Sequence, residues 1–298
     1  MSDKGHIAVI GTFDGVHRGH RFLLEKLRSR GKATGLSPMV VTFAAHPLSV
    51  VRPDAAPKLL TTLPERLKLL GEAGIGDVVV LPFDDVLRQM SAREFMTMLR
   101  DRHGVKALLV GFNHRFGCDK LEGLADYRRI GCEIGVDVTK ADEYKPADGV
   151  AISSSAIRKN ILDGDVAAAA RSLGRSYSIA GTVGRGKQLG RTIGFPTANV
   201  KDVDSDKILP ATGVYAATVT VDNRLRRAVV NVGHRPTVDC SIDAPLSIEA
   251  HIPGFEGDLY GCPVEVAFDE RIRGERRFHS LDELRSQIAL DIASLNNQ

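Results

Sequence analysis

The stretch IAVIGTFDGVHRGH, residues Ile7 to His20, places an apolar run directly before a glycine-rich turn that closes on two histidines. The run from Ile7 to Ile10 predicts a short buried strand, and the interleaved apolar and basic side chains from Arg21 to Arg30 predict the helix that follows. A turn between a strand and a helix attracts phosphate, because free backbone amides and the positive end of the helix dipole face it. The stretch therefore predicts an α/β fold with an anion site at its first turn.

This turn offers several groups to a phosphate. Gly19 lets the backbone approach an anion closely, and the imidazoles of His17 and His20 add hydrogen-bond donors. A lone His-x-Gly-His pattern also occurs in ordinary turns, but the strand before it and the helix after it favour the phosphate site. Asp14 is either a ligand or a turn residue. The candidate residues of the turn are Gly11, Phe13, Asp14, His17, Gly19 and His20.

Strands and helices alternate through the first half of the chain. Further strands are predicted at Met39 to Phe43, Asp77 to Leu81 and Lys106 to Val110. Helices are predicted at Pro64 to Glu72 and, behind a capping box, at Ser91 to Arg102. The alternation predicts a mostly parallel sheet with helices on both faces, in which ligands bind outside the carboxyl ends of the strands.

A serine cluster, ISSSAIR, ends at Arg158. Its hydroxyls and amides suit a phosphate, with Ser154, Ser155 and Arg158 as candidates, and they equally suit a plain helix N-cap. A helical stretch from Ala156 to Leu173, broken near Gly164, then leads to Gly174. We place the domain boundary there, between residues 1–174 and 175–298.

The second half is β-rich. Strands are predicted at Gly213 to Val221, Arg227 to Val232, Leu246 to His251 and Pro263 to Phe268, with turn residues between them. This spacing is typical of a small antiparallel barrel or sandwich. An amphipathic helix from Ser280 to Leu295 is expected to cover it.

A second phosphate-type stretch, GTVGRGKQLGRTIGFPTAN, runs from Gly181 to Asn199. It is not a P-loop, because Gln188 stands where the Ser or Thr that holds Mg²⁺ is required. Glycines and a proline also oppose the helix that a P-loop needs, so a β-hairpin flap is predicted instead. Lys187 and Arg191 either assist with phosphates or are simply solvated. The candidates in the flap are Gly181, Gly186, Lys187, Gly190, Arg191, Gly194 and Pro196.

Composition narrows the function classes. The 298 residues suit about two domains, and a net charge of +3 is too small for the strong field of a nucleic-acid binder. The four cysteines show no metal-type spacing and indicate free thiols. The N-terminus lacks the features of a secretory signal, and no apolar run approaches the ~20 residues of a membrane span. We therefore expect a cytoplasmic protein with neither nucleic-acid nor membrane partners.

Along essentially its whole length the chain resembles the bacterial bifunctional riboflavin kinase/FMN adenylyltransferase (FAD synthetase) family. The string GFPTAN, which ends at Asn199, is the most specific motif. The other matching segments are GTFDGVHRGH, TFAAHP (Thr42 to Pro47), GFNHRFG (Gly111 to Gly117), ISSSAIR, PATGVY (Pro210 to Tyr215), Asn231 to Thr237, Ile248 to His251, Leu259 to Gly261, and Arg271 to Arg273. The resemblance implies a Rossmann-like nucleotidyltransferase domain followed by a six-stranded riboflavin kinase barrel with a C-terminal helix.

The resemblance implies a kinase step in which ATP phosphorylates the ribityl 5′-hydroxyl of riboflavin, giving FMN. That hydroxyl is a weak acid, so a carboxylate is expected to accept its proton. Glu249 is the candidate base, because alternation puts it on the face of Ser247 and His251, and a Glu on the inner face of a strand is costly unless used. The alternative is a Glu that simply faces solvent. Thr197 and Asn199, two apart on an extended segment, can present oxygens to Mg²⁺. Asn231 and Arg271 complete the expected ATP and flavin set.

The second implied step adenylylates FMN with ATP and Mg²⁺, giving FAD and pyrophosphate. The attacking phosphate is already anionic at pH 7, so positioning and charge stabilisation suffice. His17, His20, Ser154 and Arg158 fit that demand, and Asn113 joins them in the expected nucleotide site. The chain departs from the usual family pattern near this site, at Ala44, Ala45, Asn113, His114 and Lys120.

Two other functions compete with this interpretation of the sequence. One is a monofunctional riboflavin kinase with a nucleotide-binding or regulatory N-domain. The other is an RNA-binding protein, for which stacking aromatics should interleave with basic residues on a sheet face. The β-rich half has no Trp, and its few aromatics are scattered, so RNA binding is disfavoured.

Overall fold

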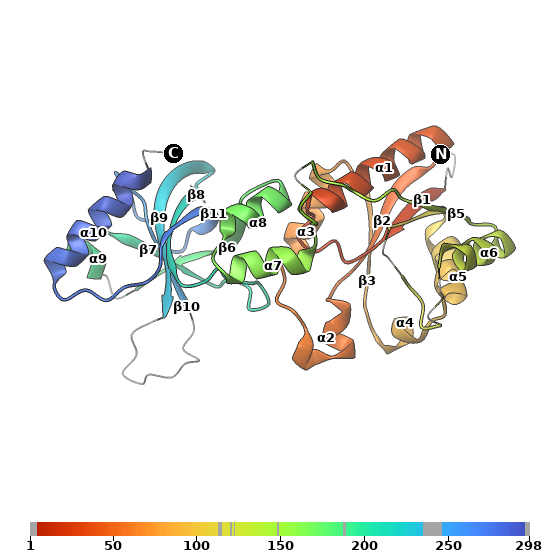
Figure 1. The fold of residues 1–298 in the computed structure, drawn as a ribbon, viewed down its shortest axis with the longest axis horizontal. Helices are drawn as coiled ribbons and strands as arrows, with labels where there is room; N and C mark the ends of the chain where they lie inside the picture. The colour runs from red at the N-terminus through yellow and green to blue at the C-terminus, as the bar shows by residue number, and fades with distance from the viewer. Residues whose placement is uncertain are drawn as a thin grey trace. The chain divides into compact units, whose positions relative to one another are not determined.

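The computed structural model describes residues 5–112, 115–119, 121, 123–147, 149–186, 189–234 and 246–295. The chain divides into two compact units, Met1–Ser154 and Ser155–Gln298 (Figure 1). This division precedes Gly174, so helices α7 (Ser154–Leu162) and α8 (Val166–Leu173) fall almost entirely in the second unit, where α8 packs on the barrel. The functional boundary near Gly174 stays a prediction.

In the described part of the first unit, five parallel strands form a sheet in the order β3-β2-β1-β4-β5. The chain enters the sheet at its central strand, β1. It then adds β2 and β3 on one side and β4 and β5 on the other, so the strand order reverses between β1 and β4. Ligands of such sheets bind at this reversal point. The strands are β1 (His6–Ile10), β2 (Ser37–Phe43), β3 (Asp77–Leu81), β4 (Val105–Val110) and β5 (Asp137–Lys140).

Helices cover both faces of this sheet, as the sequence predicts. Side chains alternate along β1: Ile7 and Val9 pack with leucines of α1 (Arg18–Thr34) and α3 (Leu63–Glu72). Ala8 and Ile10 face the other core, which α5 (Ala92–His103) and α6 (Leu124–Ile134) close. The capping box of α5 is present, with Ser91 and Glu94 each bonding the other's backbone amide. Short helical segments complete the unit: α2 (Pro47–Val51), η1 (Pro53–Ala55) and α4 (Asp85–Gln89).

The second unit contains a closed antiparallel barrel with the order β10-β7-β6-β11-β8-β9 over its described residues. The six-stranded barrel is thus confirmed. Its C-terminal helix α10 (Leu281–Ser294) packs over Val214 and Val229 of the barrel wall. The strands are β6 (Tyr177–Gly184), β7 (Thr197–Lys201), β8 (Gly213–Val221), β9 (Arg224–His234), β10 (Leu246–His251) and β11 (Pro263–Arg273).

The expectation that glycines and proline exclude a helix between Gly181 and Asn199 is wrong for one turn. Strands β6 and β7 form the predicted hairpin, but a single helical turn, α9 (Leu189–Thr192), lies between them. The turn closes locally, because the Phe195 amide donates to the Gly190 carbonyl at 2.8 Å. Gly194, at φ 87°, then reverses the chain, a conformation that favours glycine.

Candidate active sites

The first turn of the N-terminal unit is strained. Phe13 and Val16 are buried and adopt positive φ angles of 48° and 38°, and Gly15 between them has φ 83°. Non-glycine residues with positive φ are uncommon and gather at functional sites. The turn ends at His17, whose Nδ1 accepts the His20 amide at 3.2 Å and so caps the N-terminus of α1.

The two histidines of the turn stack on each other, with ring centroids 3.6 Å apart. Since Nδ1 of His17 is an acceptor, Nε2 carries the proton of its neutral form. Burial, together with the charges of His17 and Arg66, holds the pKa of His20 well below its ordinary value. Nδ1 of His20 is buried and has no hydrogen-bond partner among the described residues. The pair thus presents imidazole edges that a phosphate could use.

Glycine is needed at position 19 for a second reason, besides letting the backbone approach a ligand. A Cβ at this position would come within 3.3 Å of the His17 ring, so a larger residue would push the capping imidazole aside. Gly11 likewise makes room for Phe13, whose ring would lie 3.1 Å from its Cβ. The glycines therefore keep the histidine turn in shape.

Asp14 is held inside the unit. Its carboxylate accepts hydrogen bonds from the amides of Leu60 and Thr61 at 2.9–3.0 Å and from the Thr61 hydroxyl at 3.0 Å. These bonds favour the turn residue over the ligand, the two alternatives that the sequence leaves open. Ser154 donates to the Asp14 carbonyl at 2.9 Å, which joins the serine cluster to the same turn.

The other predicted residues of this site remain predictions. Ser155 and Arg158 lie on α7 in the second unit. Asn113, His114 and Lys120 lie outside the described residues. Ala44 and Ala45 directly follow β2, where Ala44 donates to the Leu81 carbonyl at 2.9 Å.

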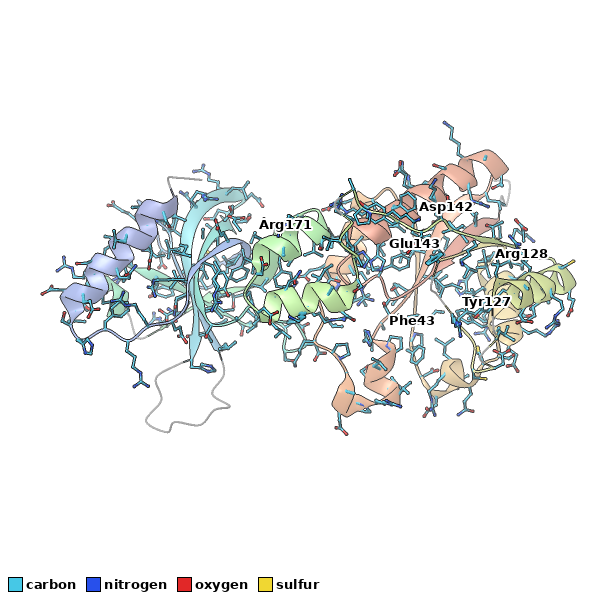
Figure 2. The ribbon with its side chains drawn as sticks, viewed as in Figure 1. Phe43, Tyr127, Arg128, Asp142, Glu143 and Arg171 are labelled. Carbon is cyan, nitrogen blue, oxygen red and sulfur yellow. The ribbon has the colours of Figure 1, made fainter. Side chains whose placement is uncertain are left out.

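An aromatic pocket that the sequence did not predict opens beside this turn. It has a volume of about 350 Å³ and contains Thr12 of the turn and the basic side chains of Arg88 and Arg115. Its apolar walls come from four separate segments, through Phe43, Phe83, Phe95 and Phe116. Tyr127, labelled on α6 in Figure 2, stacks on Phe116 at 4.3 Å and bonds its backbone amide and carbonyl. The pocket is large and apolar enough for a planar heterocycle.

In the barrel, cross-strand pairing gathers the predicted kinase residues. Glu249 on β10 pairs with Asn199 of β7 on one side and with Asn231 of β9 on the other. Directly paired residues project from the same face of a sheet, so these three side chains form a row. Thr197 joins the row, and its hydroxyl donates to Glu249 Oε2 at 3.3 Å.

The face that carries Glu249 is not the barrel interior, which corrects the expectation of an inner-face glutamate. The alternating residues Val230, Val232, Ile248 and Ala250 fill the interior and are buried. Glu249 instead lines a cavity of about 310 Å³ beneath α10. The cavity also contains Asn231, His251, Arg273, Phe195, Phe278 and Ile288.

Three contacts fix the walls of this cavity. Buried His251 donates through Nδ1 to the Pro196 carbonyl at 2.8 Å, and its ring meets Phe195 edge-on. On the opposite wall Arg273 of β11 and Asp291 of α10 form an ion pair at 2.8 Å. Arg273 was not among the predicted site residues. Arg271, which belongs to the expected ATP and flavin set, donates from Nη2 to the Thr212 carbonyl at 2.6 Å and does not line this cavity.

The predicted flap residues lie around Thr197 and Asn199, at one end of the row that contains Glu249 and Asn231. A Cβ at Gly186 would collide with the Asn199 side chain, and one at Gly181 would collide with the Lys201 carbonyl. Arg191, Pro196 and Thr197 line a second cavity of about 370 Å³, together with Phe255 and Tyr260. Thr197 belongs to both cavities, which therefore adjoin at this residue. Lys187 lies outside the described residues.

Comparison with known proteins agrees with this division into two kinds of site. The FAD synthetase family model matches residues 1–156, and the riboflavin kinase family model matches residues 173–298. A bifunctional riboflavin kinase/FMN adenylyltransferase of Escherichia coli K12 is 40% identical over 97% of this chain and 91% of its own. The enzyme of the same name from Bacillus subtilis is 33% identical over 96% and 90%. This chain belongs to that family.

The fold comparison covers the same extent. A crystal structure from Streptococcus pneumoniae, described as a macrolide-efflux protein, superposes with a TM-score of 0.88 at 30% identity over 99% of this chain and 95% of its own. That name is the other protein's. No helix in the described ranges of this chain is both long and apolar enough to cross a bilayer.

Proposed function

We propose that the family's two activities are divided between the two units. Both family models match, so the chain is a bifunctional riboflavin kinase/FMN adenylyltransferase, not the monofunctional kinase. In our proposal the barrel unit phosphorylates riboflavin with ATP. The N-terminal unit adenylylates FMN with ATP and releases pyrophosphate.

In the kinase reaction Glu249 accepts the proton of the riboflavin 5′-hydroxyl as the oxygen attacks the γ-phosphorus of ATP. The bond from the γ-phosphorus to the bridging oxygen breaks, and ADP leaves. The apolar walls of the cavity beneath α10 suit the isoalloxazine ring, and the second cavity, with Tyr260, suits the nucleotide. Thr197 belongs to both cavities, so the two reacting atoms meet beside it.

Thr197 and Asn199 are the residues that would hold Mg²⁺. Their side-chain oxygens lie on one face with the Glu249 carboxylate, a hard-oxygen set of the kind that Mg²⁺ accepts together with substrate phosphates. A bound Mg²⁺ neutralises charge on the ATP phosphates. Thr197 also orients the Glu249 carboxylate, because its hydroxyl donates a hydrogen bond to Glu249 Oε2.

In the adenylyl reaction the FMN phosphate attacks the α-phosphorus of ATP, and pyrophosphate leaves. The aromatic pocket binds the flavin ring. Arg88 and Arg115, which line the pocket, donate hydrogen bonds to the anionic oxygens of the substrates. The amides at the start of α1 and the edges of His17 and His20 face the phosphates. No base is needed, because the attacking phosphate is already ionised.

We also place the enzyme in the cytoplasm, where ATP is supplied. Cys118, Cys132 and Cys262 are free thiols, which a reducing compartment preserves.

The observation that carries the kinase assignment is the row of Asn199, Glu249 and Asn231 with the Thr197 hydroxyl on Glu249. The test is Glu249→Gln, which keeps the shape of the side chain and removes the proton acceptor. Conversion of riboflavin to FMN should fall by about 10²-fold or more. Glu265→Gln, on the exposed surface of β11, is the matched control. Near-normal kinase turnover in folded Glu249→Gln would overturn the assignment.

A further inference from the structure

A buried arginine lies beneath the histidine turn. Arg66, on α3, is 2% exposed. Moving a guanidinium out of water costs several kcal/mol unless hydrogen bonds and charges compensate it. Nη1 donates to the Phe43 carbonyl at 2.8 Å and to the Thr42 hydroxyl at 3.2 Å, both at the carboxyl end of β2. Nε is buried without a hydrogen-bond partner among the described residues.

The charge of Asp14 does not offset the burial of Arg66. Asp14 is the carboxylate whose charge acts on it, and that charge raises the pKa of Arg66 while burial, the larger effect, lowers it. The Asp14 oxygens are already bonded to the amides of Leu60 and Thr61 and to the Thr61 hydroxyl. Arg66 is therefore a fixed positive charge in a region of low dielectric.

Hydrogen bonds connect this charge to the anion site. The Thr42 hydroxyl that accepts from Arg66 donates in turn to the Thr12 carbonyl at 3.2 Å, and the Gly11 amide donates to the Val41 carbonyl at 3.0 Å. Arg66 thereby ties α3 to the end of β2, and β2 to the start of the turn. An arginine at an ordinary structural position would reach solvent or a carboxylate.

We propose that Arg66 is a positioning residue of adenylyl transfer. It holds the end of β2 against the turn of Gly11 to His20 and places close to this turn a positive charge whose burial Asp14 does not fully offset. Burying a cation there is worthwhile only if an anion is bound above it, which the adenylyl reaction supplies. This inference rests on the proposed function of the N-terminal unit.

The charge also contributes to the low pKa of His20, after burial and the charge of His17. The ionisable groups acting on its imidazole are His17, from the same turn, and Arg66, from α3, while Asp14 faces Arg66. Burial is the largest cause of the low pKa of His20, and the charge of Arg66 lowers it further, so the ring is neutral at pH 7. Without that charge the imidazole should accept a proton at higher pH.

The test uses the full chain with Arg66→Met, which removes the charge but keeps a long apolar side chain. Arg66→Lys keeps the charge and loses the two-bond geometry, and Lys68→Met removes an exposed charge from the same helix as a matched control. For Arg66→Met the kcat of FAD formation from FMN should fall about 10- to 100-fold, with a smaller change in KM. Kinase turnover of the same sample should be unchanged, which shows that the barrel unit is folded, and a parent-like circular dichroism spectrum should show the same for the N-terminal unit. Arg66→Lys should recover part of the loss.

The second readout is titration of the His20 ring by NMR. In Arg66→Met the ring should titrate at higher pH than in the parent, and in Arg66→Lys near the parent value. Unchanged kcat, or an unchanged His20 titration in folded Arg66→Met, would overturn the proposal. If the parent makes no FAD at all, the proposed function of the unit has failed, and the NMR titration still decides whether the charge of Arg66 acts on the turn.

Discussion

The ion pair between Arg273 and Asp291 should hold α10 over the flavin cavity. Asp291 is 2% exposed and accepts from Arg273 Nε at 3.0 Å, from Arg273 Nη2 at 2.8 Å, and from Gln287 at 2.9 Å. Asp291→Asn keeps the volume but removes the charge. Breaking a buried pair costs 3–5 kcal/mol, and because the Arg273 side chain keeps 20% exposure we take the lower end, about 3 kcal/mol.

The assay is urea unfolding of the full chain together with kinase kinetics. The barrel transition of Asp291→Asn should lose about 3 kcal/mol relative to Asp282→Asn, an exposed position on the same helix. The KM for riboflavin should rise while kcat changes little, because Leu284 and Ile288 of α10 line the cavity and Glu249 is untouched. FAD formation from FMN should be unaffected. An Asp291→Asn chain with the stability and riboflavin KM of the control would refute the reasoning.

Three further outcomes are expected. Thr197→Ala and Asn199→Asp should each raise the Mg²⁺ concentration needed for half-maximal kinase activity, and an unchanged Mg²⁺ titration would make the GFPTAN string a structural turn. Phe83→Ala should raise the KM for FMN in FAD formation about tenfold or more while leaving the KM of the kinase for riboflavin alone; equal effects on both would remove the flavin from the aromatic pocket. Because the folded protein holds the pKa of His20 below the ordinary value of about 6.5, the unfolded chain binds the proton first and stability falls as pH drops below that value. His20→Gln should therefore lose less stability between pH 7 and 5, as measured by thermal unfolding, and a loss equal to the parent's would exclude His20 as the cause.

Elements with a clear hydrophobic period could be predicted closely from the sequence. The bounds predicted at Asp77 to Leu81 and Gly213 to Val221 are those of β3 and β8. The start of β11 at Pro263 was predicted, but its end was not. Its register shifts after Phe268 and again after Arg271, so the apolar alternation stops while the strand continues to Arg273.

Those two irregularities also explain why Arg273, which the sequence did not single out, lines the cavity beneath α10. Simple alternation puts Arg271 and Arg273 on one face, but the register shift between them separates their surroundings. Arg273 reaches the cavity and Asp291, whereas Arg271 bonds the Thr212 carbonyl. The position of a bulge cannot be read from a single sequence, because a bulge has no fixed sequence pattern.

Arg66 did leave a signal. It occurs at helical spacing with Leu63, Leu69 and Leu70, which places a charged residue on the apolar stripe of α3. A charged side chain at such a position indicates either that the buried charge serves the function of the protein or that the helix is wrongly assigned. The aromatic pocket left no such signal, because Phe43, Phe83 and Phe116 come from separate segments that only the sheet brings together.

The central claim is that two separate sites in one chain perform the two reactions, and crossed variants test it most directly. Products formed from riboflavin, ATP and Mg²⁺ are separated by chromatography for Glu249→Gln and for the double variant His17→Ala/His20→Ala, with FMN as a second starting substrate. We predict that Glu249→Gln makes FAD from FMN but little FMN from riboflavin, and that the histidine variant makes FMN but no FAD. If either variant, shown to be folded, loses both conversions, the two-site account is contradicted and the chain works as one composite active site.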